Sequence, residues 1–278
     1  MKKVLLTVST VCLLASVPLV GQASPEEDLK AFRDFYKERF PDTAFEDLKD
    51  GVYSIDADAR AQWEDIEEFP PYELGLANGE ELFNTPFANG KTYADCFENG
   101  GIGIRQNYPY FDKDTGKVVT LEIAINQCRV KNGEEPLKGK RGPIADISAY
   151  MAYTSRGNVF NIEIPDDPRA LAAYEKGRQF YYTKRGQLNM SCADCHMTYA
   201  GHKIRTELLG PGLGQVTHFP VYRSKWGALG TLHRRYAGCN EQVRARAFEA
   251  QGEEYANLEY FHTYLSNGLE VNGPGARK

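Results

Sequence analysis

The chain has 278 residues, of which 42% are hydrophobic, and its 38 acidic side chains outnumber the 33 basic ones to give a formal net charge of −5. An acidic chain is a poor candidate for binding nucleic acid, because phosphate backbones attract basic proteins. The length is enough for two domains of ordinary size, so we expect more than one hydrophobic core.

Residues 1–23 have the pattern of a secretory signal peptide. Lys2 and Lys3 precede an apolar stretch, and small residues lead to Ala23, after which we expect cleavage. A membrane anchor is the alternative, but the stretch is short for a span and contains serine and threonine. We therefore predict an exported, periplasmic protein without a membrane span. Loss of the two leader lysines moves the net charge from −5 to about −7.

Two helices are predicted at the start of the mature chain. Residues 26–40 place Leu29, Phe32 and Tyr36 on one apolar face, and residues 57–69 form a second helical stretch that ends before two prolines. We expect residues 24–70 to form an N-terminal helical extension that packs on the rest of the chain.

Residues 71–160 and 161–278 resemble each other. The run at 79–83 precedes Cys96 much as the run at 177–181 precedes Cys192. Further on, ISAYMAYTSRG at 147–157 resembles LEYFHTYLSNG at 258–268, and the same offset of 111 residues relates Cys128 to Cys239.

Several matches in register predict two copies of one helical domain, joined by a proline-containing linker at 161–168. The predicted fold is mainly α, although residues 117–126 are β-prone and predict a short strand.

The run Cys192-Ala193-Asp194-Cys195-His196 is the strongest chemical signal in the chain. Two thiols one helical turn apart can each add to a vinyl group of one porphyrin, and the adjacent histidine can then bind the iron. A zinc site would need a second pair of ligands, and a redox dithiol would not need the histidine. We predict one covalently attached haem c with His196 as an iron ligand.

The second axial ligand of this haem is less obvious. Met190 and Met197 flank the motif too closely to reach the opposite face, and Met151 belongs to the other half. Histidines remain possible, namely His202, His218, His233 and His262. We favour Cys239, which lies more than forty residues beyond the motif and close to two arginines that would stabilise its thiolate.

Cysteine counting supports this choice. Cys12 lies in the leader, so five cysteines remain, and Cys192 and Cys195 are assigned to haem. A disulfide of Cys239 is the alternative, but the odd total argues against it. The first half lacks the haem motif, so we predict that Cys96 and Cys128 pair with each other. That bond closes a loop of about 30 residues and contributes about 3 kcal/mol.

Arg234 and Arg235 lie one helical turn before Cys239. They could belong to an ordinary solvated helix face. The spacing of four residues, however, allows Arg235 to share a face with Cys239, and guanidinium groups bind oxyanions through paired N–H donors. We therefore predict an anion-binding role for Arg235.

These residues resemble the SoxA family of catalytic cytochrome subunits from the SoxAX complex of sulfur-oxidising bacteria, in particular its single-haem branch. The resemblance spans the mature chain, including the haem motif and the segment 235–239. It implies L-cysteine S-thiosulfotransferase activity, in which thiosulfate is joined oxidatively to a cysteine of the carrier SoxYZ. Electrons would leave through haem, with SoxX as partner and a small cytochrome c as acceptor.

The resemblance also implies that Cys239 is both an iron ligand and the active cysteine, carried as a persulfide, and that Arg235 binds the substrate. It assigns no role to Lys203, Arg234 or His233. Two alternatives remain: a thiosulfate dehydrogenase that forms tetrathionate, and a simple low-potential electron-transfer cytochrome.

Overall fold

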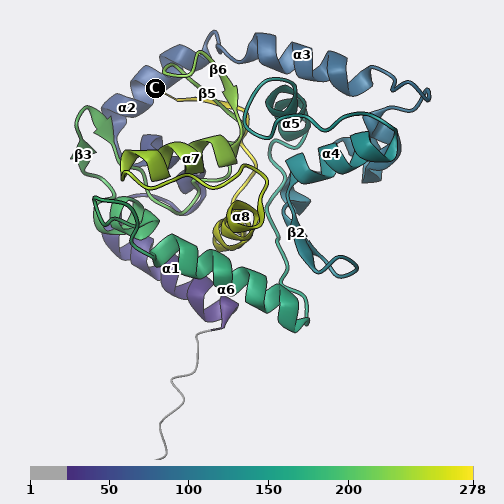
Figure 1. Cartoon of the computed structure of the whole chain (residues 1–278). Helices are drawn as coiled ribbons and strands as arrows, with labels where there is room; N and C mark the ends of the chain where they lie inside the picture. The colour runs from purple at the N-terminus through teal and green to yellow at the C-terminus, as the bar shows by residue number, and fades with distance from the viewer. Residues whose placement is uncertain (1–23, 278) are drawn as a thin grey trace, which may run out of the picture.

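The computed structural model describes residues 24–277, and the predicted mainly α fold is confirmed within them (Figure 1). The predicted leader at 1–23 lies outside the described residues. No helix in the described part of the chain has both the length and the apolar character needed to span a membrane. The α-helices are α1 (Pro25–Arg39), α2 (Ala57–Glu67), α3 (Glu73–Asn84), α4 (Leu121–Lys131), α5 (Pro143–Tyr153), α6 (Pro168–Tyr182), α7 (Leu232–Gln242) and α8 (Glu253–Leu265).

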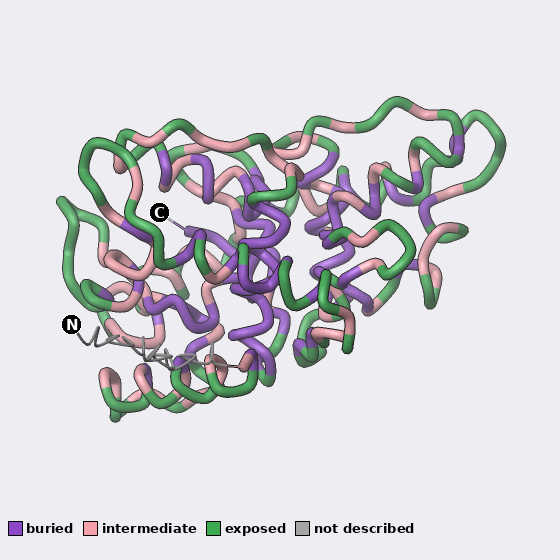
Figure 2. The backbone as a smooth tube through the Cα atoms, turned by 60° about the horizontal axis from the view of Figure 1, so that its bottom comes forward, coloured by how far each residue is buried: buried purple, intermediate pink, exposed green. Residues whose placement is uncertain are grey.

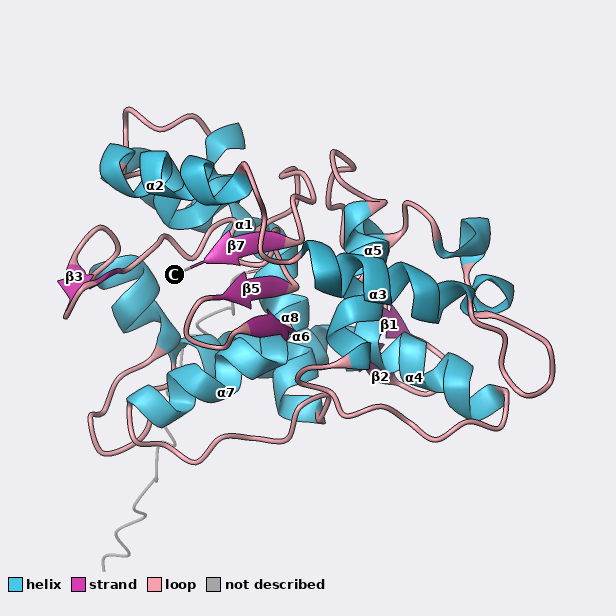
Figure 3. Ribbon diagram, turned by 90° about the horizontal axis from the view of Figure 1, so that it is seen from above, coloured by secondary structure: helices cyan, strands magenta, loops and turns pink. Residues whose placement is uncertain are grey.

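The strands are two or three residues long and form three small sheets. β1 pairs antiparallel with β2, β3 pairs antiparallel with β4, and β5 lies between antiparallel β6 and parallel β7. Figure 3 shows this last sheet between α2 and α7. The strands are β1 (Tyr110–Asp112), β2 (Lys117–Val119), β3 (Lys203–Ile204), β4 (Glu207–Leu208), β5 (Val221–Arg223), β6 (Ala228–Gly230) and β7 (Gly275–Arg277).

The N-terminal segment contains both helices predicted there. The side chain of Ser24 accepts from the backbone N–H of Glu27, and the Glu27 carboxylate accepts from the Ser24 N–H, which fixes the start of α1. Phe32 and Tyr36 on the apolar face of α1 are buried in the core that also contains α6 and α8. A 3-10 segment, η1 (Glu46–Ser54), leads to α2.

The repeat detected in the sequence is also a repeat of secondary structure. β1, β2 and α4 of the first half recur as β5, β6 and α7, each beginning and ending 111 residues later. The helix caps recur too, because Thr120 caps α4 and Thr231 caps α7 through their side-chain oxygens. The two halves therefore share one local architecture.

The β-prone segment 117–126 forms a strand only at its start. β2 ends at Val119, and the remaining residues belong to α4, because Thr120 accepts from the Ile123 N–H and starts the helix. Leu121 and Ile125 are buried on one side of that helix, so packing outweighs the β preference of these residues.

The first half has its own apolar core, and a larger core joins α1, the β1–β2 hairpin and the second half. Figure 2 shows the buried backbone in the interior with exposed loops around it. In Figure 1, α3, α4 and α5 gather on one side, and α1, α6 and α8 on the other. The halves meet across a buried charged cluster. Arg105 lies 3.5 Å from Glu259 of α8, whose other oxygen is 3.1 Å from His233 Nε2 of α7. Burial and the nearby charge of Glu259 raise the pKa of Glu122 on α4.

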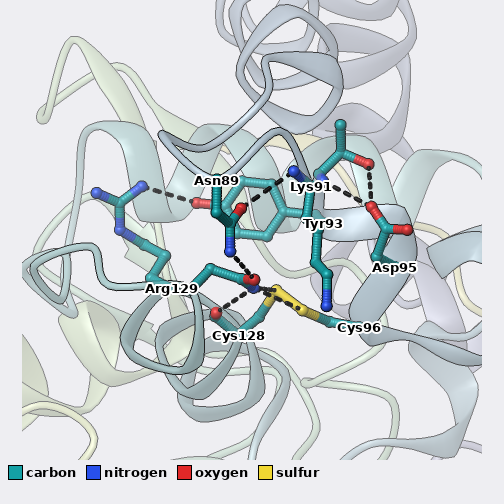
Figure 4. Close-up of a disulfide and its surroundings, with 9 residues drawn as sticks. Asn89, Lys91, Tyr93, Asp95, Cys96, Cys128 and Arg129 are labelled. Atoms are coloured by element: carbon teal, nitrogen blue, oxygen red, sulfur yellow. Dashed lines mark hydrogen bonds between the residues drawn. A yellow bond between two sulfur atoms is a disulfide. The ribbon is translucent and has the colours of Figure 1, made fainter.

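The core of the first half contains a disulfide between Cys96 and Cys128 (Figure 4). The Cα atoms are 5.8 Å apart, within the normal range for such bonds. The amide of Asn132 donates to the Cys128 carbonyl oxygen at 2.9 Å and lies 3.4 Å from the Cys96 sulfur. The disulfide thus takes up the two cysteines that the first half possesses.

Candidate functional site

The Cys-x-x-Cys-His run sits on a short helical turn that begins at Ser191. The Asp194 carboxylate accepts from both the N–H and the hydroxyl of Ser191, at 2.8 and 2.9 Å, and the Ser191 oxygen accepts from the Asp194 N–H at 3.0 Å. This reciprocal cap starts a turn of π-helix at Asp194–Thr198. Cys192, Cys195 and His196 all face one cavity as a result.

The imidazole of His196 is held in a defined orientation. Its Nδ1 lies 3.0 Å from the carbonyl oxygen of Gly210, which can only accept, so the proton resides on Nδ1. Nε2 then carries the lone pair and is the atom that would bind a metal, and the carbonyl contact at Nδ1 is typical of the outer partner of a ligating histidine. The Gln215 amide nitrogen lies 3.1 Å from each ring nitrogen.

Helix α1 holds the backbone of this turn. The hydroxyl of Tyr36 donates to the His196 carbonyl oxygen at 2.6 Å and accepts from the Gly212 N–H at 2.9 Å. Tyr36 is buried, so this polar link is shielded from water. The N-terminal segment therefore fixes the position of the histidine.

The cavity is lined mostly by apolar side chains. Such a lining suits a flat, largely apolar cofactor, and the two free thiols and His196 lie at the cavity wall, as attachment of a haem requires. The apolar and aromatic lining residues are Phe180, Tyr181, Ile204, Leu209, Leu232, Tyr236, Val243 and Leu258.

Helix α7 forms another part of the cavity wall. Its residues Arg235 and Cys239 also line the cavity, four positions apart on one helical face. The Cys239 thiol is close enough to hydrogen-bond with His196. The two residues predicted as axial ligands thus face each other.

The three free cysteines differ in their electrostatic surroundings. Burial raises the pKa of Cys192 to about 12, and burial also raises the pKa of Cys195. Burial acts on Cys239 in the same direction, but the charge of Arg235, the hydrogen bond with His196 and the charge of Arg223 together lower its pKa to about 7. Cys239 is therefore the cysteine best suited to act as a thiolate.

Arg223, like Tyr36, was not predicted from the sequence to act near this site. It ends β5, and its charge acts on Cys239 and on Arg235, although it is twelve residues before Arg235 in the chain. Its side chain lies 3.4 Å from the Glu207 carboxylate. The offset of 111 residues could have drawn attention to Arg223, because the equivalent residue of the first half, Asp112, has the opposite charge.

Most of the other ligand candidates have different surroundings. Met151 lies in the core of the first half, whereas Met190 lines the cavity beside the motif. His262 lines the cavity, but its ring nitrogens contact the Tyr236 hydroxyl at 3.1 Å and the Gly212 carbonyl oxygen at 2.9 Å, so neither is free. Burial lowers the pKa of His262 to about 4.

The remaining candidates do not line the cavity. His233 accepts from the Gln251 N–H and faces Glu259, and His218 is buried elsewhere. His202 and Lys203 are exposed, and Met197 packs against the core of the second half. The Arg234 guanidinium lies 4.2 Å from the centre of the Trp226 ring and donates to the Leu229 carbonyl oxygen.

Comparison with known proteins gives the family context of this site. Residues 78–160 match the family described as "SoxA/TsdA, cytochrome c domain". That match covers the half with the disulfide and stops before the Cys-x-x-Cys-His run.

Similarity to individual proteins extends further. The chain is 58% identical to the L-cysteine S-thiosulfotransferase subunit SoxA of Allochromatium vinosum, over 95% of each chain. It is 55% identical to the subunit of the same name from Chlorobaculum tepidum, over 92% of this chain and 89% of that one. A crystal structure of SoxXA from P. pantotrophus superposes with a TM-score of 0.71 and 31% identity, covering 78% of this chain and 84% of that one.

Proposed function

Because the chain belongs to the SoxA family of L-cysteine S-thiosulfotransferase subunits, we propose that it is a sulfur-oxidation cytochrome that joins thiosulfate to a cysteine of the carrier protein SoxYZ. The observation that carries this proposal is the cavity in which the haem motif faces Cys239, with Arg235 beside the thiol. Such a site combines a cofactor, a nucleophilic sulfur and an anion-binding group.

The cofactor is one haem c. Cys192 and Cys195 would attach it through thioether bonds, and His196 and Cys239 would bind its iron. The free thiols, the His196 orientation set by Gly210 and the apolar cavity all fit this group. When bound, the haem supplies a one-electron outlet for the oxidation.

The reaction joins two sulfur atoms. The sulfane sulfur of thiosulfate bonds to the carrier cysteine, the cysteine thiol releases its proton, and two electrons leave to acceptors outside this site. Cys239, carried as a persulfide, would be the sulfur nucleophile, because its lowered pKa favours the charged form. Arg235 would bind the oxyanion end of thiosulfate and direct the sulfane sulfur toward Cys239.

The partners follow from the same family membership. The name of the similar crystal structure pairs SoxA with SoxX, and we propose a SoxX subunit for this chain, with a small cytochrome c as the final acceptor. We place the complex in the periplasm, since haem c attachment and the predicted leader both suit an exported protein.

The decisive experiment replaces the proposed nucleophile. In the purified complex with SoxX, we expect Cys239→Ala to lower thiosulfate-dependent conjugation of SoxYZ by at least about 100-fold. Covalent haem should be retained, because Cys192 and Cys195 are unchanged. His202→Ala, which alters an exposed histidine outside the cavity, is the control and should conjugate at the wild-type rate.

Mass spectrometry of the intact wild-type chain should show one haem and an additional mass of about 32 Da on Cys239, the mass of one persulfide sulfur. Full conjugation by Cys239→Ala would reject the proposed mechanism. Tetrathionate formed without any carrier would instead favour a thiosulfate dehydrogenase, and electron transfer without either product would favour a simple cytochrome.

A further inference from the structure

Arg185 is a cation on the cavity wall that no carboxylate of residues 24–277 neutralises. The described residues that line the cavity include two arginines, Arg185 and Arg235, and no aspartate or glutamate. The buried Nε of Arg185 has no hydrogen-bond partner within the described part of the chain. The adjacent Lys184 is the residue that lies 3.7 Å from the Asp194 carboxylate. Because a buried polar group without a partner is costly, we expect Arg185 to pair with an anion that is not part of the protein chain.

Two aromatic rings hold the Arg185 side chain. Its Cζ lies 3.9 Å from the centre of the Phe180 ring and 5.2 Å from the centre of the Phe248 ring. Phe180, in the last turn of α6, also lines the cavity. Aromatic faces attract cations, and a stacked guanidinium keeps its N–H donors free in the plane of the group. The side chain is therefore preorganised to bind a planar carboxylate.

The backbone of Arg185 is tied both to the haem motif and to α7. Arg185 and Met190 exchange N–H···O bonds of 3.0 and 3.2 Å, which close a short loop directly before the motif. The Leu188 N–H donates to the carbonyl oxygen of Val243, at the end of α7. Gly186 has a φ of +66°, and a Cβ there would lie 2.1 Å from the same carbonyl oxygen, so the loop requires glycine at this position.

The first half shows that the fold does not require this charge. Helices α3 and α6 both end on a threonine cap, and Thr85 and Thr183 have ψ angles of 124° and 122°. The offset between these caps relates Arg185 to Phe87, whose N–H also closes a short loop, by donating to the Lys91 carbonyl oxygen at 2.7 Å. Phe87 packs in the core of the half that has the disulfide. An apolar residue thus suffices there, and the arginine occurs in the half with the haem motif.

We propose that Arg185 binds a propionate carboxylate of the haem. This inference rests on the proposed function, which places a haem c in the cavity. The edge of a haem carries two propionates, and an ionised carboxylate beside apolar side chains needs a counter-charge. Arg235, the other arginine of the wall, lies one helical turn from Cys239 and is the proposed substrate ligand. Arg185 lies outside α7 and precedes the motif, so it is available to the cofactor.

The test measures the reduction potential of the haem against pH, without thiosulfate, carrier or acceptor. The complete complex with SoxX is titrated with reductant between about pH 5 and pH 9, and EPR identifies the thiolate-bound haem. At about pH 8, Arg185→Gln should lower the equilibrium constant for one-electron reduction at least about tenfold, which is about 59 mV. The reason is that an unpaired carboxylate near the iron disfavours the added electron.

The pH dependence distinguishes a bound propionate from a cation that only lies near the haem. In Arg185→Gln the unpaired propionate binds a proton as the pH falls, so the potential should rise toward the wild-type value near pH 5. In the wild type Arg185 keeps the propionate ionised, and this rise should be absent. Other titrating groups of the cavity, such as His262, act in both proteins and cancel in the difference. A difference of equal size at every pH, or no difference, would overturn the inference.

Arg244→Gln is the matched control. It removes the same charge from an exposed arginine outside the cavity, whose side chain lies 3.4 Å from Gln187 of the same loop. Because exposed charges are screened, its equilibrium constant for reduction should stay within about twofold of the wild-type value at every pH. Arg185→Lys keeps the charge and should restore most of the wild-type potential.

Variants that lose the cofactor also give a decision. If Arg185→Gln does not retain covalent haem, Arg185→Met, which keeps an aliphatic contact with the two phenylalanine rings, replaces it in the titration. If neither variant retains haem, Arg185→Lys must retain it with the wild-type potential, and otherwise the inference is rejected. Weaker thiosulfate binding by Arg185→Gln with an unchanged potential would assign Arg185 to the substrate and overturn the inference.

The outcome is independent of carrier conjugation, which is assayed separately. A pH-dependent shift of the potential in a complex that forms no SoxYZ conjugate would support Arg185 as a haem-binding residue and reject the proposed function. Normal conjugation without that shift would reject only the role of Arg185.

Discussion

Individual buried carboxyl groups set how the stability of this molecule responds to pH. Glu122 is buried between the halves, where it accepts a hydrogen bond from the Ser148 hydroxyl at 2.8 Å. Desolvation, aided by the charge of Glu259, raises its pKa above the ordinary value of 4.5. The folded state therefore binds the Glu122 proton more tightly than the unfolded state does.

The sign of the resulting pH dependence follows from this difference. Protonated Glu122 makes its full contribution to the free energy of unfolding below pH 4.5. That contribution is lost as the pH rises through the folded-state pKa of Glu122. Glu122→Gln keeps a neutral side chain at all pH values, so it should melt at a higher temperature than the wild type at pH 8. The advantage should shrink toward pH 4, each kcal/mol corresponding to about 2–4 °C. Melting curves from pH 4 to 8 check this, and an advantage that does not depend on pH would contradict it.

At the scale of elements, the disulfide joins two parts of the first half and lies in its apolar core. It connects η2 (Tyr93–Cys96) to α4 across 32 residues of sequence. Constraining a loop of that length in the unfolded chain is worth about 3 kcal/mol. Cys96→Ala/Cys128→Ala should therefore lower the free energy of unfolding by about that amount, measured by denaturant titration.

The same variant should keep its haem spectrum, because the cavity lies in the other half. Reductant should destabilise the wild type and leave the variant unchanged. A loss of haem from the folded variant, or no loss of stability, would show that this element has a different role.

The elements also show what sequence patterns can predict here. The repeat was visible because its cysteines and closing helices keep one offset, and the structure extends that offset to β1, β2, α4, β5, β6 and α7. The short strand expected within 117–126 forms only at 117–119, because the cap at Thr120 and burial of Leu121 start a helix there. The cavity brings together Cys192, Cys195, His196 and Cys239. The first three were predicted from the Cys-x-x-Cys-His motif, and Cys239 from the number of cysteines and its neighbouring arginines.

Residues whose role depends on contacts distant in sequence escaped prediction. Tyr36 reaches the His196 carbonyl across 160 positions, and the charge of Arg223 acts on Cys239 from a separate strand. Neither interaction leaves a periodic pattern or a spacing rule in the sequence. Only a comparison of the two halves, position by position, marks Arg223 as a residue specific to one of them.

At the scale of the whole molecule, charge is distributed unevenly between the site and the remainder. Residues 184–246 contain ten basic and three acidic side chains, a net charge of +7, in a chain whose total is −5. The remainder therefore sums to −12. A local positive field within an acidic molecule attracts small anions to the site while the overall charge keeps the protein soluble. Such attraction is screened by salt over about 10 Å at 0.1 M.

The proposed function then predicts a strong salt dependence. We expect kcat/KM for thiosulfate to fall about tenfold between about 20 and 300 mM NaCl, because electrostatic attraction of the dianion weakens. Lys203→Glu/Lys225→Glu, which reverses two exposed charges within the basic segment, should lower the rate at low salt and flatten this slope. Lys91→Glu/Lys131→Glu makes the same charge change at exposed positions of the first half and should leave the slope at its wild-type value. Equal slopes in both variants would mean that net charge, and not its placement around the site, governs the encounter.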